Sequence, residues 1–338
     1  MFEAVGLFVL GLFLLALGGD SIVKGASGLA QRFGASPFAA GLVLVAFATS
    51  LPELAVNLQA VVRGQQALAL GNAVGSNIVN FGLTLGLAAL AAPLVVRWRA
   101  LAPLLVLLLV GTLVVIGLGL DGALSRREGV AMLVAFVIVV AYATSRTRHE
   151  APELQDAIAA FAQTQTNLGL NLVRVLIAAL LLHLGAYLIV GGNGLWSFGG
   201  AAPALAGGFG SPNAAIIGAG LGLSPLLTGL LPVAIGTALP EVAAAVAAAR
   251  RGQGDIVVGH VIGSSLFNLL IVLGGMAALH TVPLPASFVR FELPAAAVFA
   301  LMLYPMLKGD LRISKREGAI LLVALLGWIG FELLMLHQ

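Results

Sequence analysis

Long apolar runs dominate the chain, and short charged or glycine- and proline-rich segments separate them. A membrane-spanning helix takes about 20 mainly apolar residues, and most of these runs are at least that long. The pattern predicts about ten such helices, at residues 4–30, 38–62, 67–92, 100–119, 127–145, 169–191, 214–249, 256–279, 289–307 and 315–336. The one clearly polar connection divides the chain into a five-helix unit (1–145), a central loop (146–168) and a second five-helix unit (169–338).

The composition agrees with a membrane protein. The 338 residues are 60% hydrophobic and only 9% charged, whereas soluble domains are about 45–50% apolar and about 25% charged. We therefore predict an all-α polytopic membrane protein whose surroundings are the lipid bilayer. The net charge of +3 comes from few charged residues and does not indicate nucleic-acid binding. Because the chain has no cysteine, disulfides and thiolate metal sites are excluded.

The lysines and arginines predict an orientation. If the N-terminus lies outside, alternate connections place thirteen of the 17 Lys and Arg on the inner side and four on the outer side. Cytoplasmic loops are enriched in these residues. We therefore expect both termini outside, the central loop inside, and the protein in the cell (inner) membrane.

The two halves contain a repeated segment. At a constant offset of 188 residues, 41–90 aligns with 229–278 without a gap, and about two positions in five are identical. An ungapped match of this length indicates an internal duplication. Because each unit has an odd number of helices, the second copy must enter the membrane from the opposite face. Inverted repeats with interrupted helices and a midplane site are the pattern of secondary transporters.

Each copy places a proline and a glutamate inside an apolar run, in ATSLPEL (48–54) and GTALPEV (236–242). Pro52 and Pro240 lack an N–H, so we expect interrupted helices 2 and 7 with carbonyls released one turn earlier. Such carbonyls are tolerated in a membrane only where protein, water or ions satisfy them. Beside them lie Glu53 and Glu241, together with the hydroxyls of Thr49, Ser50 and Thr237. Oxygen donors of these kinds suit hard cations such as Ca²⁺ and Na⁺.

The helix that follows each LPE segment adds further polar side chains. Ser76 and Asn80 are four residues apart, as are Ser264 and Asn268, so each pair shares one helix face. Glycines in the same helices, such as Gly71 and Gly75, allow close packing. The inverted symmetry predicts that Glu53 and Glu241 face each other near the midplane.

The charge of this site suggests a mechanism. Two ionised glutamates carry a charge of −2, which one Ca²⁺ neutralises. An empty site would leave two like charges away from water, which is unfavourable unless they protonate. We therefore expect the carrier to change its open side only when Ca²⁺, Na⁺ or protons occupy the site, which gives exchange.

These segments, with GNAVGSNIVN (71–80) and GHVIGSSLFN (259–268), resemble the calcium/cation antiporter superfamily, in its prokaryotic sodium/calcium exchanger branch. The resemblance implies alternating access, in which the first and sixth helices slide past a core of the other eight. It implies that Glu53, Glu241 and the backbone oxygens of Thr49 and Thr237 hold Ca²⁺. For Na⁺ it implies Ser50, Ser76, Ser264, the Thr hydroxyls and the carbonyls of Ala46 and Ala234. Asn80 and Asn268 would complete the middle of the site.

The chain departs from the family pattern at three places. Ala238 replaces the serine of the second motif, which removes one hydroxyl and puts the Na⁺ stoichiometry or affinity in doubt. Asn268 stands where many relatives have aspartate, which disfavours K⁺ co-transport. About 15 extra Gly-, Ala- and Pro-rich residues, around 201–215, precede the seventh helix.

Several other readings remain open. Exchange of Ca²⁺ or another divalent cation for H⁺ is the alternative, although the LPE form favours the sodium branch. A passive channel would conduct without a counter-ion. An intramembrane diacid hydrolase would need two carboxyls in different environments, whereas these two lie in symmetric settings, so we expect no enzyme activity. We expect no cofactor, inorganic cations as ligands, and a monomer sufficient for transport. We also expect a structural Asp20–Lys24 pair and an interfacial position for Arg290 and Glu292.

Overall fold

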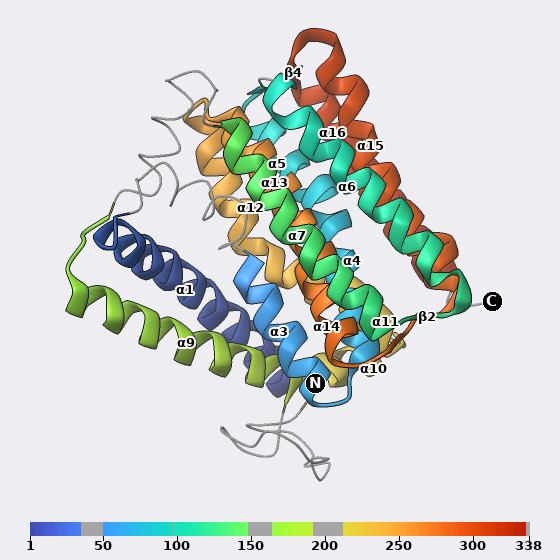
Figure 1. Cartoon of the computed structure of the whole chain (residues 1–338). Helices are drawn as coiled ribbons and strands as arrows, with labels where there is room; N and C mark the ends of the chain where they lie inside the picture. Colours follow the sequence, from blue (N-terminus) through green and yellow to red (C-terminus); the bar gives the residue numbers. More distant parts are fainter. Residues whose placement is uncertain (35–49, 97, 148–163, 192–211, 336–338) are drawn as a thin grey trace.

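The protein is a bundle of long helices, and within the described ranges short connections join them (Figure 1). The computed structural model describes residues 1–34, 50–96, 98–147, 164–191 and 212–335. The first half contains α1 (Phe2–Arg32), α3 (Leu51–Val62), α4 (Gln66–Val79), the π-helical segment η2 (Asn80–Thr84), α5 (Leu85–Ala91), β1 (Leu94–Val95), α6 (Trp98–Leu118), the short 3₁₀ turn η3 (Gly119–Asp121), β2 (Ala123–Leu124) and α7 (Arg126–Thr147).

The second half has a similar order of elements. It contains α9 (Leu168–Val190), α10 (Asn213–Gly220), α11 (Pro225–Thr228), the π-helical segment η4 (Gly229–Val233), α12 (Ala234–Arg250), α13 (Gly254–Phe267), the π-helical segment η5 (Asn268–Leu273), α14 (Gly274–Leu279), β3 (Val282–Pro283), the π-helical segment η6 (Phe288–Glu292), α15 (Leu293–Asp310), β4 (Arg312–Ile313) and α16 (Lys315–Met335).

The polytopic, mainly helical character predicted from the sequence is confirmed. In the described part of the chain, eight helices are long and apolar enough to cross a membrane. α3 and α7 occupy the remaining two of the ten predicted positions. Large apolar side chains such as Leu113, Val137 and Ile138 point outward. That exposure is favourable where lipid rather than water surrounds the helices.

The single helix predicted over 214–249 is wrong, because the chain turns at Leu221–Ser224 between α10 and α11. Gly222 has a φ of +72°, a left-handed conformation that glycine adopts without steric cost. The Ser224 side chain then accepts a hydrogen bond from Leu227 N–H, and Pro225 begins α11. The cap and the proline start a new helix here. Most of the extra segment expected at 201–215 lies outside the described residues.

The helix interruption expected at Pro240 is also not found at that residue. α12 continues through Pro240, and the irregular stretch of this helix lies further upstream, in η4, which contains Pro232. Since Pro240 still has no N–H, the Gly236 carbonyl cannot receive its usual helical hydrogen bond. The proline therefore frees an acceptor without breaking the helix. Single π-helical turns often mark functional sites.

The two halves meet through reciprocal contacts. β1 pairs antiparallel with β4, and β2 pairs antiparallel with β3. At the offset of 188, β1 corresponds to β3 and β2 matches β4 to within one residue, so each half supplies one strand to each pair. The labels β4 and β2 lie at opposite ends of the bundle in Figure 1. This exchange between opposite ends supports the predicted inverted repeat.

α1 and α9 lie side by side at the left of Figure 1 and pack closely against each other. Gly11, Gly18 and Gly25, spaced seven residues apart, form the contact stripe on α1. A Cβ atom added at Gly11 would lie 2.8 Å from the Gly185 carbonyl oxygen, and one added at Gly185 would lie 2.7 Å from the Gly11 oxygen. Small residues at such positions let membrane helices approach closely.

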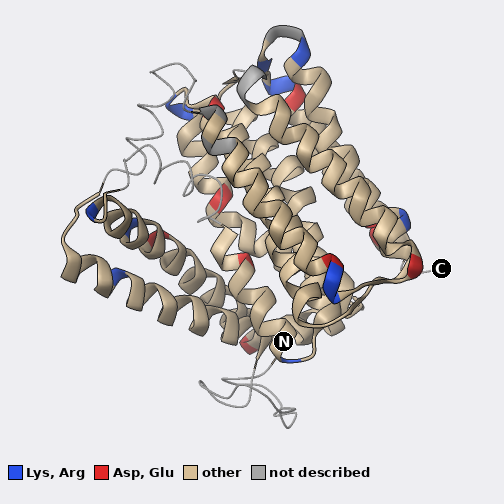
Figure 2. Ribbon diagram, viewed as in Figure 1, with Lys and Arg blue, Asp and Glu red and all other residues tan. Residues whose placement is uncertain are grey.

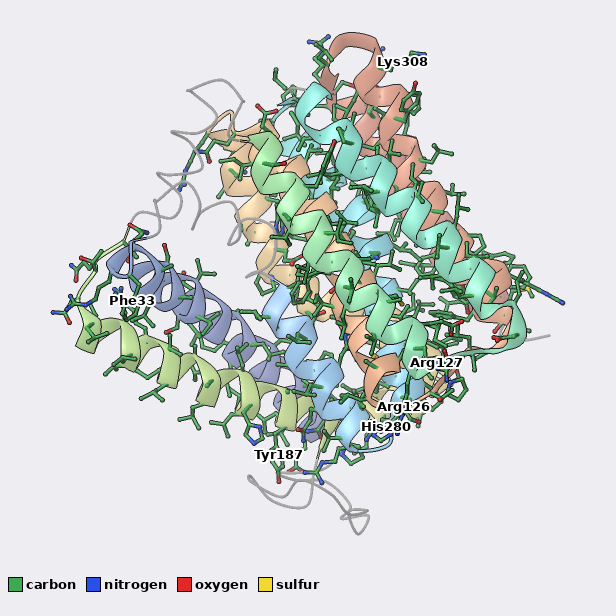
Figure 3. All side chains as sticks on the ribbon, in the orientation of Figure 1. Phe33, Arg126, Arg127, Tyr187, His280 and Lys308 are labelled. Atoms are coloured by element: carbon green, nitrogen blue, oxygen red, sulfur yellow. The ribbon has the colours of Figure 1, made fainter. Side chains whose placement is uncertain are left out.

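Charged residues gather near the helix ends, while the helices are mainly uncharged along their length (Figure 2). Arg126, Arg127 and His280 lie at one end and Lys308 at the other (Figure 3). The Asp20–Lys24 ion pair is confirmed, with 2.6 Å between Nζ and Oδ2.

The interfacial position expected for Arg290 and Glu292 stays a prediction. Arg290 is exposed, whereas the Glu292 side chain is buried at 3% exposure. It interacts electrostatically with Glu332 of α16, whose side chain is also buried. These two carboxyl groups belong to the outer helices α15–α16 and their π-helical entry, not to the repeated motifs.

Candidate cation site

Glu53 lies in the first turn of α3, and the local sequence explains why that helix starts there. Ser50 is the residue before the helix, and Pro52 occupies one of its first two positions. A proline fits this turn because its missing N–H would have no helical partner anyway. A helix N-terminus also favours a nearby carboxylate. Ser50 and Glu53 are both fully buried.

α12 presents the corresponding residues of the second copy. Thr237 and Glu241 are four residues apart, so they share one helix face, and their exposure is 1% and 2%. The Thr237 hydroxyl donates a hydrogen bond to the Ala234 carbonyl at 3.3 Å. Two of the oxygens expected to bind Na⁺ therefore already contact each other.

The remaining polar residues come from the long helices that follow. Ser76 is on α4 and Ser264 on α13. Asn80 and Asn268 are the first residues of the π-helical segments η2 and η5. All four side chains are fully buried. The same local irregularity at the equivalent residue of each copy places both asparagines at a change in helix geometry.

Hydrogen bonds join residues from four helical elements into one cluster. Ser50 Oγ lies 2.6 Å from Ser264 Oγ, and either hydroxyl can donate. The Asn80 amide donates to Ser264 Oγ at 3.1 Å, and Ser264 Oγ lies 3.4 Å from Glu241 Oε1. Ser264 therefore connects the first motif to the carboxylate of the second.

The two carboxylates also interact directly. Glu53 is close enough to Glu241 for electrostatic repulsion, and the Thr237 hydroxyl lies nearby, outside hydrogen-bond geometry. Both Glu53 carboxyl oxygens and Glu241 Oε2 have no hydrogen-bond partner among the described residues. No Lys or Arg forms an ion pair with either group in that part of the chain. Buried like charges of this kind need a compensating cation or proton.

Two of the predicted ligands, Ala46 and Thr49, lie outside the described residues and have no place in the observed site. Ser76 Oγ and both amide atoms of Asn268 have no hydrogen-bond partner in the described ranges. The oxygen atoms of these buried side chains are therefore available as neutral ligands for a cation.

Sequence reasoning did not single out three further buried contacts. The Asn72 amide donates to Asn57 Oδ1 at 2.9 Å, and the Asn77 amide donates to the Ser265 carbonyl at 3.2 Å. His260 Nε2 lies 3.8 Å from Glu241 Oε2. The signal was present in the repeat, because His260 matches Asn72 at the offset of 188, and Ser265 matches Asn77.

The fold and the site define a polytopic membrane transporter with a buried acidic centre. The model of the sodium/calcium exchanger protein family matches residues 3–145 and 172–334. The chain therefore belongs to the sodium/calcium exchanger protein family. Its members are membrane exchangers, and the predicted superfamily is confirmed.

Individual relatives match over most of their length. The putative antiporter CaxA of Alkalimonas amylolytica is 34% identical over 95% of this chain and 96% of its own. The inner membrane protein YrbG of Escherichia coli is 34% identical over 81% of this chain and 79% of its own. The structure of the sodium-calcium exchanger NCX_Mj soaked with Na⁺ and Sr²⁺ matches with a TM-score of 0.65 and 28% identity, over 97% of this chain and 98% of the other.

Proposed function

We propose that this protein exchanges Na⁺ for Ca²⁺ by alternating access, at a midplane site built from Glu53 and Glu241. The observation that carries the proposal is the meeting of two buried carboxylates, one from each copy of the motif, without a Lys or Arg partner in the described residues. One Ca²⁺ would neutralise the pair. Several Na⁺ ions could do the same with help from the neutral hydroxyl and amide oxygens.

The same exchange mechanism assigns roles to the two halves of the chain, to its termini and to the α1–α9 pair. The units 1–145 and 169–338 would be the two inverted repeats, and 146–168 the cytoplasmic loop. Both termini would lie outside, in agreement with the charge asymmetry of the connections. The α1–α9 pair would slide as one unit past the other helices, and a monomer would suffice for transport. The assignment of Na⁺ and Ca²⁺ as the exchanged ions is supported by the similarity to the sodium/calcium exchanger MaX1 of Methanosarcina acetivorans, which is 28% identical over 94% of this chain.

A flux measurement tests this function. Proteoliposomes loaded with Na⁺ and diluted into Na⁺-free buffer should accumulate radioactive calcium, whereas K⁺-loaded vesicles should not. Calcium uptake that follows an imposed pH difference instead would replace Na⁺ by H⁺ as the coupling ion. Calcium flux that needs no counter-ion would contradict exchange and indicate a channel.

H⁺ coupling remains the second candidate because of Ala238. This residue is fully buried and packs with Val79 and Ala234. It provides no hydroxyl at a position where its counterpart, Ser50, bonds to Ser264. The mirror-image partner would be Ser76, whose hydroxyl has no partner among the described residues. The second half of the site therefore has one oxygen fewer for Na⁺.

Ala238→Ser should strengthen Na⁺ binding. The added hydroxyl would face Ser76 as Ser50 faces Ser264, and so restore a symmetric oxygen donor. We expect a several-fold lower Na⁺ concentration for half-maximal calcium release, because a neutral hydrogen-bonding group contributes about 0.5–1.5 kcal/mol. Sodium titration of calcium efflux measures the effect. Ala219→Ser, in α10 away from this cluster, is the control, and an equal shift in both variants would contradict the assignment.

A further inference from the structure

The second half of the site contains an imidazole, whose ring nitrogen can ligate a metal ion. Residues 1–145, the first half, contain no histidine. His260 lies on α13, four residues before Ser264, and is buried at 7% exposure. Its Nε2 atom lies 3.8 Å from Glu241 Oε2. At this distance the two atoms are too far apart for a hydrogen bond. Two ligands of one metal ion, each about 2.1 Å from it, can be separated by this amount.

Comparison of the two copies of the repeat shows how the surroundings of His260 differ from those of its counterpart. In the first half, Asn72 donates to Asn57 Oδ1 at 2.9 Å. The residues that match these two at the offset of 188 are His260 and Ala245. Ala245 has no polar side chain, so the mirror image of that amide pair cannot form. His260 is instead placed beside the carboxylate of the cation site.

We infer that His260 and Glu241 together bind a divalent transition-metal ion, so that the site accepts ions such as Mn²⁺, Co²⁺ and Zn²⁺ as well as Ca²⁺. Calcium prefers oxygen ligands, whereas imidazole nitrogen suits first-row transition metals. A neutral imidazole adds no charge, so a divalent ion still balances the two glutamates. This inference deepens the proposed function and rests on it for the location of the ion.

Neutral oxygens would complete the coordination. The described residues contain no cluster of three His, Asp or Glu side chains able to hold a metal together. Ser264 Oγ, however, lies 3.4 Å from Glu241 Oε1. Asn268, one turn further along from Ser264, has two amide atoms without hydrogen-bond partners among those residues. A mixed site with one nitrogen, one carboxylate and neutral oxygens is weaker than a structural zinc site, as release of a transported ion requires.

His260→Asn tests the inference, because it places in the second half the side chain that the first half has at Asn72. Purified full-length protein is titrated with Co²⁺ and, separately, with Ca²⁺. We expect Co²⁺ affinity to fall by roughly 10–100-fold, the loss typical of damaged metal coordination. Calcium affinity should change much less, because the amide oxygen is a ligand that Ca²⁺ accepts. His280→Asn, at an exposed position, should alter neither affinity.

Pulsed electron paramagnetic resonance of bound Mn²⁺ gives a second, direct readout. The wild-type complex should show coupling of the electron spin to an imidazole ¹⁴N nucleus, and His260→Asn should abolish it. Equal losses of Co²⁺ and Ca²⁺ affinity, coupling that persists in the variant, or tighter Ca²⁺ binding with unchanged Co²⁺ binding would overturn the inference. In the last case His260 would be a positive partner of Glu241.

The two proposals fail in different ways. Sodium-driven calcium uptake with no dependence of Co²⁺ affinity on His260 would overturn the inference and support the exchange function. Nitrogen coupling that depends on His260, in a protein without sodium-driven calcium uptake, would support the ligand and overturn the exchange function. Failure of the wild-type protein to bind either Co²⁺ or Mn²⁺ would also overturn the inference.

Discussion

Proteoliposomes that contain the Glu53→Gln or the Glu241→Gln variant should lose sodium-driven calcium uptake by about 100-fold or more. Each substitution keeps the size of a fully or nearly fully buried side chain but removes one of the two charges that balance Ca²⁺. Changes to groups outside the metal's own ligands already cost about 10–100-fold in affinity or activity, so loss of a charged ligand should cost at least as much. Initial rates of radioactive calcium uptake measure the effect.

Both variants should still fold, because the structure gives these carboxyl groups unfavourable neighbours. Glu53 and Glu241 repel each other, and replacement of one relieves that repulsion. Unchanged or higher thermal stability in detergent would therefore separate loss of the ion from loss of the fold. Glu332→Gln is the matched control, since it removes a buried carboxyl group outside the site. Normal calcium uptake by either site variant would contradict the proposed site.

Gly71→Ala should destabilise the protein by about 1–3 kcal/mol or more, the range for overpacked interiors. A Cβ atom at this position would overlap the Leu226 carbonyl oxygen, and it would lie 2.8 Å from the Leu230 nitrogen. Both are backbone atoms, which cannot move as a flexible side chain would. The reciprocal contact is as close, because a Cβ at Gly229 would overlap the Leu68 carbonyl oxygen. The substitution would therefore separate α4 from α11–η4.

The control is Gly275→Ala in α14, where an added Cβ would meet no atom within 4 Å among the described residues. Alanine is favoured over glycine inside a helix by about 1 kcal/mol, so this variant should be as stable as the wild type or more stable. Thermal unfolding in detergent compares the two. A Gly71→Ala protein with wild-type stability would mean that α4 and α11–η4 do not pack as closely as described.

Much of this protein could be predicted from the sequence because a bilayer restricts what a chain can do. Apolar runs must form helices, so the helix positions followed from hydropathy, and the repeat at the offset of 188 identified Glu53 and Glu241 as equivalent. The predicted helix over 214–249 was wrong because hydropathy does not register a turn. The turn at Leu221–Ser224 depends on the left-handed backbone of Gly222 and on a serine cap, and both are compatible with an apolar segment.

Tertiary structure decided which contacts the equivalent residues of the two copies make. Both copies have a serine at the same position, yet Ser264 contacts Ser50, Asn80 and Glu241, while the Ser76 hydroxyl has no partner among the described residues. That difference depends on which side chains of the opposite copy face each serine. His260 likewise had no role predicted from the sequence, and the fold places it beside Glu241. The sequence by itself determined the membrane helices, the duplication and the paired carboxylates, because these depend on hydropathy and on the match between two segments of the chain. Only the tertiary structure decided which donors meet around the carboxylates, because those contacts join residues about 20 to more than 200 positions apart, two of them across the two halves.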